Sequence, residues 1–229
     1  MWDIMKKKYV IAIDGPGASG KSTTAKALAR KLKYIYIDTG AMYRACALCS
    51  LENSIGLKDI PKLITMLENI DIKILYFEKG NKIFLNGNDV SQRIREADIT
   101  KLSSEIAKID IVRKKMVLLQ REIGKNGGVI MDGRDIGTVV FPNADFKFFM
   151  IANEKTRALR RWKEAAIKGE NLSLKDIEKE LIWRDANDSS RKISPLKQAE
   201  DAIPVDTSNM TIDDQVEFLF KIIMRGKSA

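Results

Sequence analysis

The stretch Gly15-Pro16-Gly17-Ala18-Ser19-Gly20-Lys21-Ser22-Thr23 fits the pattern G-x-x-x-x-G-K-[ST] at every fixed position. A mostly apolar run at 9–14 precedes it and an amphipathic helical pattern at 21–33 follows it, which is the strand–loop–helix context of a P-loop. In such a loop, backbone N–H groups converge on phosphates and the helix N-terminus adds the positive end of its dipole. We therefore expect all nine residues to bind ATP. Lys21 would act as a catalytic charge on the β- and γ-phosphates, and the Ser22 hydroxyl would face Mg²⁺.

The same glycines allow a second interpretation. Gly15, Gly17 and Gly20 also satisfy G-x-G-x-x-G after a strand, and Asp38 follows near the distance at which a dinucleotide-binding fold carries its ribose carboxylate. A nicotinamide-dependent oxidoreductase is thus an alternative. Lys21 with the neighbouring hydroxyl argues against it, because that fold places its helix on a pyrophosphate and does not use such a pair.

Strand and helix patterns alternate along the chain and predict an α/β fold, with a five-stranded parallel sheet flanked by helices. Strands are expected at 9–14, 34–38, 128–132, 146–151 and 203–206. Helices are expected at 21–33, 41–51, 100–108, 112–125, 153–167, 173–188 and 211–224. The segments 72–77 and 82–86 interrupt this rhythm and predict an antiparallel hairpin that turns at 79–81, within a small inserted subdomain at about 66–104.

Composition narrows the possible functions. The formal charge of +9 suits polyanionic ligands, although most lysines are interpreted as a solvated surface. The chain has no histidine, which excludes Ser-His-Asp and Cys-His hydrolases and His-ligated metal sites. Cys46 and Cys49 form a single C-x-x-C in a predicted helix, so we interpret them as two apolar side chains on one helical face. No secretory signal and no apolar run of about 20 residues is evident, so a cytoplasmic protein without membrane contact is expected.

An arginine series follows the P-loop. Arg44 ends the block 38–44, and Asp-Gly-Arg-Asp at 132–135 ends the third predicted strand. Arg184, Asp188 and Arg191 are spaced at i, i+4 and i+7. Ligands of parallel α/β sheets bind outside the carboxyl ends of the strands, so we expect 38–40, Arg44 and 132–135 to face the P-loop across one cleft. Positive charge there would screen the repulsion between two phosphate groups brought into line.

Taken together, these blocks resemble bacterial cytidylate kinases of the nucleoside monophosphate kinase group. The shared patterns are D-G-P-x-x-x-G-K-S, D-[ST]-G-A-x-Y-R, D-G-R-D-x-G-T-V-V-F-P at 132–142 and R-D-x-x-D-x-x-R, and they extend over nearly the whole chain. The resemblance implies phosphorylation of CMP and dCMP to CDP and dCDP by direct in-line transfer from ATP bound with Mg²⁺, in pyrimidine nucleotide metabolism. Because the acceptor phosphate is already ionised, no general base is needed.

The resemblance also implies which residues act. The polar residues that it assigns to the CMP site are Thr39, Tyr43, Arg44, Ser104, Arg113, Arg134, Asp135, Arg184, Asp188 and Arg191. Of these, Arg134, Arg184 and Arg191 would join Lys21 as catalytic residues, and Arg157 would bind ATP. Ser104, Arg113 and Asp135 would read the cytosine edge, whose amino group needs an acceptor and whose N3 and O2 need donors. Without the resemblance, Ser104 and Arg113 would be interpreted as surface residues of two helices.

The family organisation predicts one kinase domain over 1–229. Its core would comprise 8–65, 105–156 and 190–229, with an NMP-binding insertion at about 66–104 and a helical lid at about 157–189. A monomer that does not bind nucleic acid is expected. The alternatives are a P-loop kinase for another small acceptor such as UMP, and an ATPase stimulated by nucleic acid, which the charge of +9 would suit.

Overall fold

The computed structural model describes residues 8–77, 80–167, 169 and 171–226. The chain divides into two compact units. The sheet unit comprises Met1–Tyr36 and Asn126–Ala229, and the inserted unit comprises Ile37–Lys125. The predicted insertion at 66–104 lies within the inserted unit, which extends beyond it on both sides.

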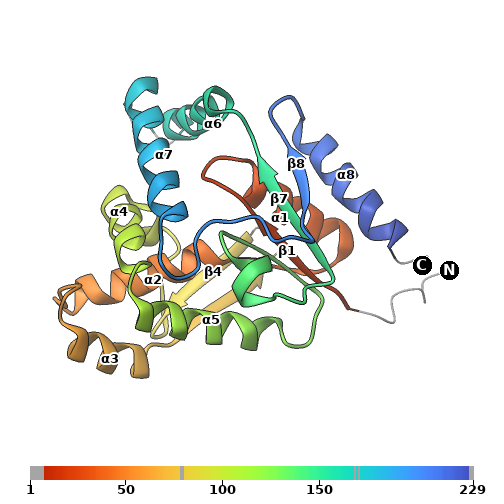
Figure 1. The fold of residues 1–229 in the computed structure, drawn as a ribbon. Coiled ribbons are helices and arrows are strands. Elements are labelled where there is room, and N and C mark those ends of the chain that lie inside the picture. The colour runs from red at the N-terminus through yellow and green to blue at the C-terminus, as the bar shows by residue number, and fades with distance from the viewer. Residues whose placement is uncertain (1–7, 78–79, 168, 170, 227–229) are drawn as a thin grey trace. The chain divides into compact units, whose positions relative to one another are not determined.

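A five-stranded sheet has the order β2-β6-β1-β7-β8, which confirms the predicted architecture. Three of its strands, β1, β7 and β8, are labelled in Figure 1. Its strands are β1 (Val10–Asp14), β2 (Ile35–Asp38), β6 (Val129–Gly133), β7 (Phe146–Ile151) and β8 (Ile203–Asp206). β1 runs parallel to β6 and β7, with Ile13 opposite both Asp132 and Phe148. The carboxyl ends of β1 and β6 are therefore adjacent, which places the P-loop beside the turn 133–135.

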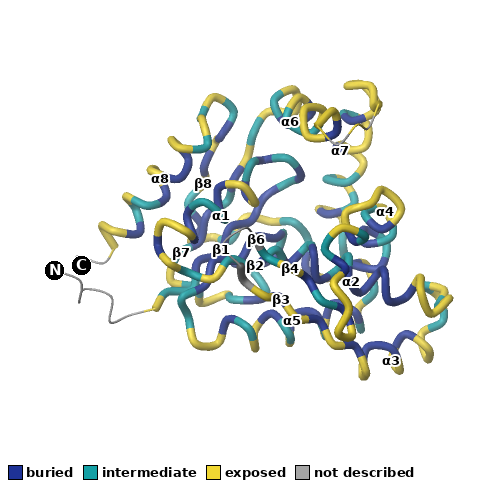
Figure 2. Tube along the Cα trace, turned by 180° about the vertical axis from the view of Figure 1, so that it is seen from behind, coloured by how far each residue is buried: buried dark blue, intermediate teal, exposed yellow. Residues whose placement is uncertain are grey.

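Two helices of the sheet unit pack against its strands, α1 (Lys21–Leu32) and α8 (Ile212–Arg225). Leu28 of α1, Phe148 of β7 and Leu219 of α8 are buried in one hydrophobic cluster. Burying each such side chain contributes about 1.5–3 kcal/mol, so the cluster holds α1 and the loop before it in place. Strands β1 and β6 are buried along almost their whole length (Figure 2).

The helices α6 (Glu154–Ile167) and α7 (Leu174–Ser189) pack against each other in the sheet unit (Figure 1). Ala158, Ile177 and Leu181 form a small buried cluster between them, and Ala18 of the P-loop packs against it. Both helices agree closely with the predicted ranges 153–167 and 173–188. The contact with Ala18 brings this helix pair to the phosphate-binding loop.

The inserted unit combines helices with a small antiparallel sheet of order β3-β4-β5. Its elements are α2 (Thr39–Glu52), α3 (Ile60–Asn69), β3 (Ile72–Phe77), β4 (Gly80–Leu85), β5 (Asn88–Asp89), a 3₁₀ turn (Arg93–Arg95), α4 (Ala97–Ile106) and α5 (Asp110–Gly124). The predicted hairpin is confirmed by the antiparallel pairing of β3 with β4, in which Ile74 lies opposite Ile83. The predicted turn at 79–81 is wrong at its last two positions, because Gly80 and Asn81 belong to β4 and pair with Phe77 and Tyr76. Residue 79 lies outside the described residues.

Besides β5 and the 3₁₀ turn, two elements were not predicted from the sequence. The helix α3 begins after Asp59, whose side chain accepts a hydrogen bond from the Lys62 N–H, and it carries Pro61 in its first turn. A capping residue followed by proline was therefore an available signal. The other element is a π-helical turn at Ile136–Val140, directly after the 132–135 block.

The two cysteines of α2 are buried, Cys46 completely and Cys49 with 3% exposure. Burial raises the pKa of the Cys46 thiol to about 12, so it is not a thiolate at neutral pH. The predicted role as apolar side chains is confirmed. Within the described ranges, no helix is long and apolar enough to cross a membrane.

Candidate active site

The P-loop leads directly into the N-terminus of α1, where the helix dipole is positive. Gly20 precedes the helix with φ of 90°, and a side chain on Gly15 would place its Cβ 2.1 Å from the Met150 carbonyl oxygen. Both positions therefore require glycine. Lys21 is 6% exposed, and its Nζ donates to the Pro16 carbonyl oxygen at 2.9 Å.

Lys21 lies in a strongly cationic environment. Burial lowers the pKa of its ammonium group, and the nearby Arg134 and Arg184 lower it further, against the opposing effects of Asp132 and Asp188. Four cationic side chains, Lys21, Arg134, Arg184 and Arg191, thus accompany the carboxylates of Asp132 and Asp188. Asp14, whose pKa burial raises to about 7, is a third carboxyl group near Lys21. A bound polyphosphate would supply the missing negative charge, so this arrangement suits an anionic ligand.

Asp132, expected to face the P-loop as part of 132–135, is a candidate site residue to which no binding role was assigned from the sequence. Ser22 Oγ donates to Asp132 Oδ2 at 2.6 Å, and the Tyr36 hydroxyl donates to Asp132 Oδ1 at 2.8 Å. A hydroxyl and a carboxylate beside a phosphate-binding loop are the hard oxygen ligands that Mg²⁺ prefers, so the residues present fit that ion. The available signal was a carboxylate at the end of a strand next to β1. Among the described residues, no group of three or more acidic or cysteine side chains forms a metal cluster by itself.

Asp14 connects the P-loop strand to the 132–135 block. Its two carboxylate oxygens accept hydrogen bonds from the N–H groups of Ile136 at 2.9 Å and Gly137 at 2.7 Å. Burial raises the pKa of Asp14 to about 7, although these two hydrogen bonds oppose the shift. The carboxylate thus holds the π-helical turn that directly follows Arg134 and Asp135.

Three of the predicted site residues meet in one ion-pair cluster. Arg134 Nε donates to Asp188 Oδ2 at 2.7 Å, and Arg191 donates to the other oxygen of the same carboxylate. Asp188 is 2% exposed; burial would raise its pKa, but Arg134 and Arg191 hold it below the usual range. Arg184 of α7 adds its positive charge to the same group, whereas Arg191 lies beyond the end of that helix. The structure therefore brings Arg134, Arg184, Asp188 and Arg191 close together.

Arg157, predicted to bind ATP, is buried against the P-loop. Its Nη1 donates to the Gly17 carbonyl oxygen at 3.1 Å and to Asp185 Oδ2. Asp185 Oδ1 accepts from the Gly17 N–H at 3.3 Å. Asp185 was not among the predicted site residues, and it contacts the loop only because α7 packs against α6.

In the inserted unit, Asp38 and Arg44 stand at the start of α2. Asp38 Oδ1 caps the helix by accepting from the Ala41 N–H at 2.9 Å, and Arg44 Nη2 donates to Asp38 Oδ2 at 2.9 Å. Burial would raise the pKa of Asp38, but Arg44 and Arg95 outweigh that effect and lower it. Arg44 Nε is buried without a hydrogen-bond partner among the described residues, which leaves a donor suited to a phosphate oxygen. Thr39 is buried beside them, with 4% exposure.

The predicted base-reading residues of this unit are buried. Arg113 is 3% exposed, donates from Nη1 to the Ala107 carbonyl oxygen at 3.1 Å, and lies 5.4 Å from the centre of the Tyr43 ring. Ser104 is 6% exposed. The alternative that Ser104 and Arg113 are surface residues is therefore wrong, because α4 and α5 turn these side chains into the unit rather than to solvent. Asp135, of the sheet unit, is also buried, at 5% exposure.

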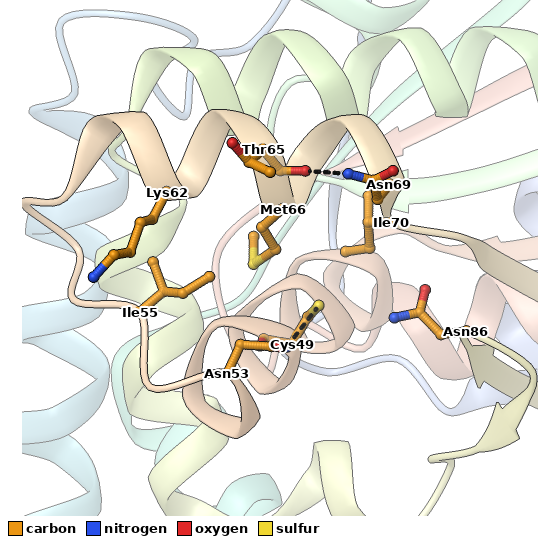
Figure 3. Close-up of a pocket in the computed structure, with 9 residues that line it drawn as sticks. All are labelled: Cys49, Asn53, Ile55, Lys62, Thr65, Met66, Asn69, Ile70 and Asn86. Carbon is orange, nitrogen blue, oxygen red and sulfur yellow. Dashed lines mark hydrogen bonds between the residues drawn. The ribbon is translucent and has the colours of Figure 1, made fainter.

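A cavity of about 430 Å³ in the inserted unit lies elsewhere (Figure 3). It is lined by the C-terminal end of α2, by α3 and by Asn86, with Cys49, Asn53 and Met66 among the wall residues. None of the predicted site residues lines it, and Thr39 and Tyr43 stand toward the other end of α2. The chemistry of the chain is therefore concentrated around the P-loop and not in this cavity.

Comparisons with known proteins identify the family of the chain. Residues 11–225 match the family model described as cytidylate kinase. The cytidylate kinase of Ligilactobacillus salivarius is 49% identical over 219 residues, covering 96% of this chain and 98% of that protein. The cytidylate kinase of Pediococcus pentosaceus is 48% identical over 219 residues, covering 96% and 97%. Among solved structures, an uncharacterized protein from Eubacterium ventriosum matches with a TM-score of 0.52 at 13% identity, covering 95% of this chain and 99% of that one, which is a likeness of fold alone.

Proposed function

The chain belongs to the cytidylate kinase family, and on that premise we propose that it transfers the γ-phosphate of ATP to CMP and dCMP. The proposal rests on the excess of positive charge beside the P-loop. The positive charges of Lys21, Arg134, Arg184 and Arg191 outnumber the negative charges of the carboxylates near them. Bringing a triphosphate and a monophosphate together requires such an excess. A P-loop kinase for another acceptor such as UMP is not favoured, since the relatives are named as cytidylate kinases.

The proposed reaction is a single in-line displacement. An oxygen of the CMP phosphate attacks the γ-phosphorus while the bond to the β-phosphate oxygen breaks, and ADP leaves with that electron pair. The P-loop, residues 15–23, would bind the ATP phosphates, with Lys21 neutralising charge on the β- and γ-phosphates. Arg44, Arg134 and Arg191 would hold the acceptor phosphate. No proton has to be removed from the nucleophile, which agrees with the absence of histidine from the chain.

Mg²⁺ is the proposed cofactor. When bound with ATP it would neutralise phosphate charge, and Ser22 and Asp132 are the side chains placed to hold it. Because the Ser22 hydroxyl now donates to Asp132, the two oxygens already lie side by side at 2.6 Å.

Selection of cytosine is assigned to Ser104, Arg113 and Asp135, and contact with the sugar to Arg184 and Asp188. Thr39 and Tyr43 would complete the acceptor site. Asp135 would accept from the cytosine amino group, whereas uracil carries a carbonyl oxygen in that position and would face the carboxylate unfavourably. α6 and α7 are proposed as the lid that excludes water from the phosphates, and the chain is proposed to act as a monomer.

The decisive experiment measures ADP formation from ATP-Mg²⁺ with CMP, dCMP, UMP, AMP, GMP or no acceptor, with products separated by chromatography. We expect CDP to form fastest, dCDP to form at a similar rate, and hydrolysis without acceptor to be slow. ATP hydrolysis at the same rate with every acceptor and without one, or ATP hydrolysis stimulated by RNA or DNA, would overturn the proposal. Asp135→Ala should lower CMP turnover far more than ATP affinity, and equal loss of both would remove its base-reading role.

A further inference from the structure

Both backbone polar groups of Gly17, at the crest of the P-loop, are bonded to the helix pair α6–α7. The Gly17 carbonyl accepts from Arg157 Nη1 at 3.1 Å, and its N–H donates to Asp185 Oδ1 at 3.3 Å. Arg157 and Asp185 also pair with each other, so the two side chains and Gly17 form a closed set of contacts. Leu181 adds packing, because its Cδ2 lies 3.2 Å from where a Cβ on Gly17 would be.

A second set of hydrogen bonds connects α6 to the P-loop, through Thr207. Arg160, one turn after Arg157, donates to Oγ1 of Thr207 at 3.0 Å and to its carbonyl oxygen at 2.6 Å. The Thr207 hydroxyl in turn donates to the Ser19 carbonyl oxygen at 2.8 Å. α6 thus contacts the loop directly at Gly17 and through Thr207 at Ser19.

Asp185 decides the orientation of Arg157 within this set. The Arg157 side chain is 7% exposed and the Asp185 side chain is 20% exposed. A buried guanidinium requires an anion, and Asp185 supplies one while it also accepts the Gly17 N–H. Without the carboxylate, Arg157 loses the partner that orients it toward the Gly17 carbonyl. Gly17 then loses the hydrogen bond from its N–H to Asp185, and the hydrogen bond from Arg157 to its carbonyl is no longer held in place.

We propose that Asp185 is a positioning residue for ATP: through Arg157 and Gly17 it holds the P-loop crest in the conformation that receives the phosphates. This inference rests on the P-loop binding ATP, as in the proposed function, but it does not depend on which acceptor is used. It assigns to Asp185 an effect on ATP binding and none on the binding of CMP.

The test compares Asp185→Ala, Asp185→Asn and the control Glu180→Gln, which removes an exposed carboxylate from the same helix. Asparagine can still accept the Gly17 N–H but loses the ion pair with Arg157, so it should give a smaller effect than alanine. We expect the KM for ATP and the Kd for ADP-Mg²⁺, measured by calorimetry, to rise about tenfold in Asp185→Ala, the size of effect that about 1.4 kcal/mol represents. The KM for CMP should stay within about twofold of wild type, as it should in the control.

An Arg157→Ala variant and the double variant complete the design. If the two residues act as a unit, the double variant should raise the Kd for ADP no further than the more severe single variant. Additive effects, an unchanged Kd for ADP, or an equal rise in the KM for ATP and CMP would overturn the proposal. Should Asp185→Ala fail to fold, Asp185→Asn and Arg157→Ala carry the same test. The calorimetric arm uses no acceptor, so its outcome is independent of whether CMP proves to be the substrate.

Discussion

Replacement of Asp188 by asparagine should destabilise the chain by about 3–5 kcal/mol, the range observed when one partner of a buried ion pair is removed. The carboxylate is 2% exposed, accepts from Arg134 Nε at 2.7 Å and pairs with Arg191 through its other oxygen. Asparagine has nearly the same shape but is neutral, and its amide NH₂ would face a guanidinium group. Because the side chains of Arg134 and Arg191 are only 16% and 8% exposed, water can compensate little of the loss.

The effect is measurable by urea unfolding at neutral pH, followed by circular dichroism. The midpoint should fall by roughly 1–5 M, since the free energy of unfolding changes by about 1–3 kcal/mol per molar urea. The exposed substitution Glu180→Gln serves as the control and should stay within about 0.5 kcal/mol of wild type.

The pH dependence of the free energy of unfolding is a second test of the ion pairs of Asp188. The pKa of Asp188 in the folded chain is lower than in the unfolded chain, because the effect of the arginines exceeds that of burial. Its contribution to stability is therefore present above the ordinary aspartate value of about 3.9 and is lost as pH falls below it. The difference between wild type and Asp188→Asn should shrink in that acidic range. A loss below about 1 kcal/mol at neutral pH would refute the argument, since it would mean that the guanidinium groups do not need this carboxylate.

Three further predictions concern the P-loop and the strands beside it. Lys21→Met should lower kcat by about 10²-fold or more, because preorganised charge on the phosphates is lost; near wild-type ADP production would contradict the role of Lys21. Asp132→Ala should raise the Mg²⁺ concentration for half-maximal activity by about 10- to 100-fold, and an unchanged Mg²⁺ titration would show that Asp132 does not hold the ion. Burial raises the pKa of Asp14 to about 7, so the folded chain holds this proton more tightly than the unfolded chain does. The resulting contribution to stability is present below the pKa of Asp14 in the unfolded chain, about 3.9, and is lost as the pH rises through 7. The free energy of unfolding of wild type, measured by urea unfolding relative to Asp14→Asn, should therefore fall by up to about 4 kcal/mol between pH 4 and 7, and a flat difference would contradict the assignment.

Much of the architecture could be predicted because its signals are local. The strands β7 and β8 occupy the predicted ranges 146–151 and 203–206, since each is a short apolar run between turn-forming residues. The P-loop is likewise specified by residues adjacent in the chain, and its glycines are needed for the backbone angles of that loop alone. The π-helical turn at Ile136–Val140 could not be predicted in this way, because the acceptor for two of its N–H groups is Asp14, 122 and 123 residues away.

The sequence by itself determined the phosphate-binding loop, the parallel sheet and the family, because consecutive residues at fixed spacing carry those signals. Only the tertiary structure decided that Asp132 lies beside Ser22, that Asp185 reaches Gly17, and that Ser104 and Arg113 are buried. Asp132 and Asp185 are separated from their partners by 110 and 168 residues. Whether such side chains meet depends on how strands align and helices pack, and spacing along the chain contains no measure of that distance.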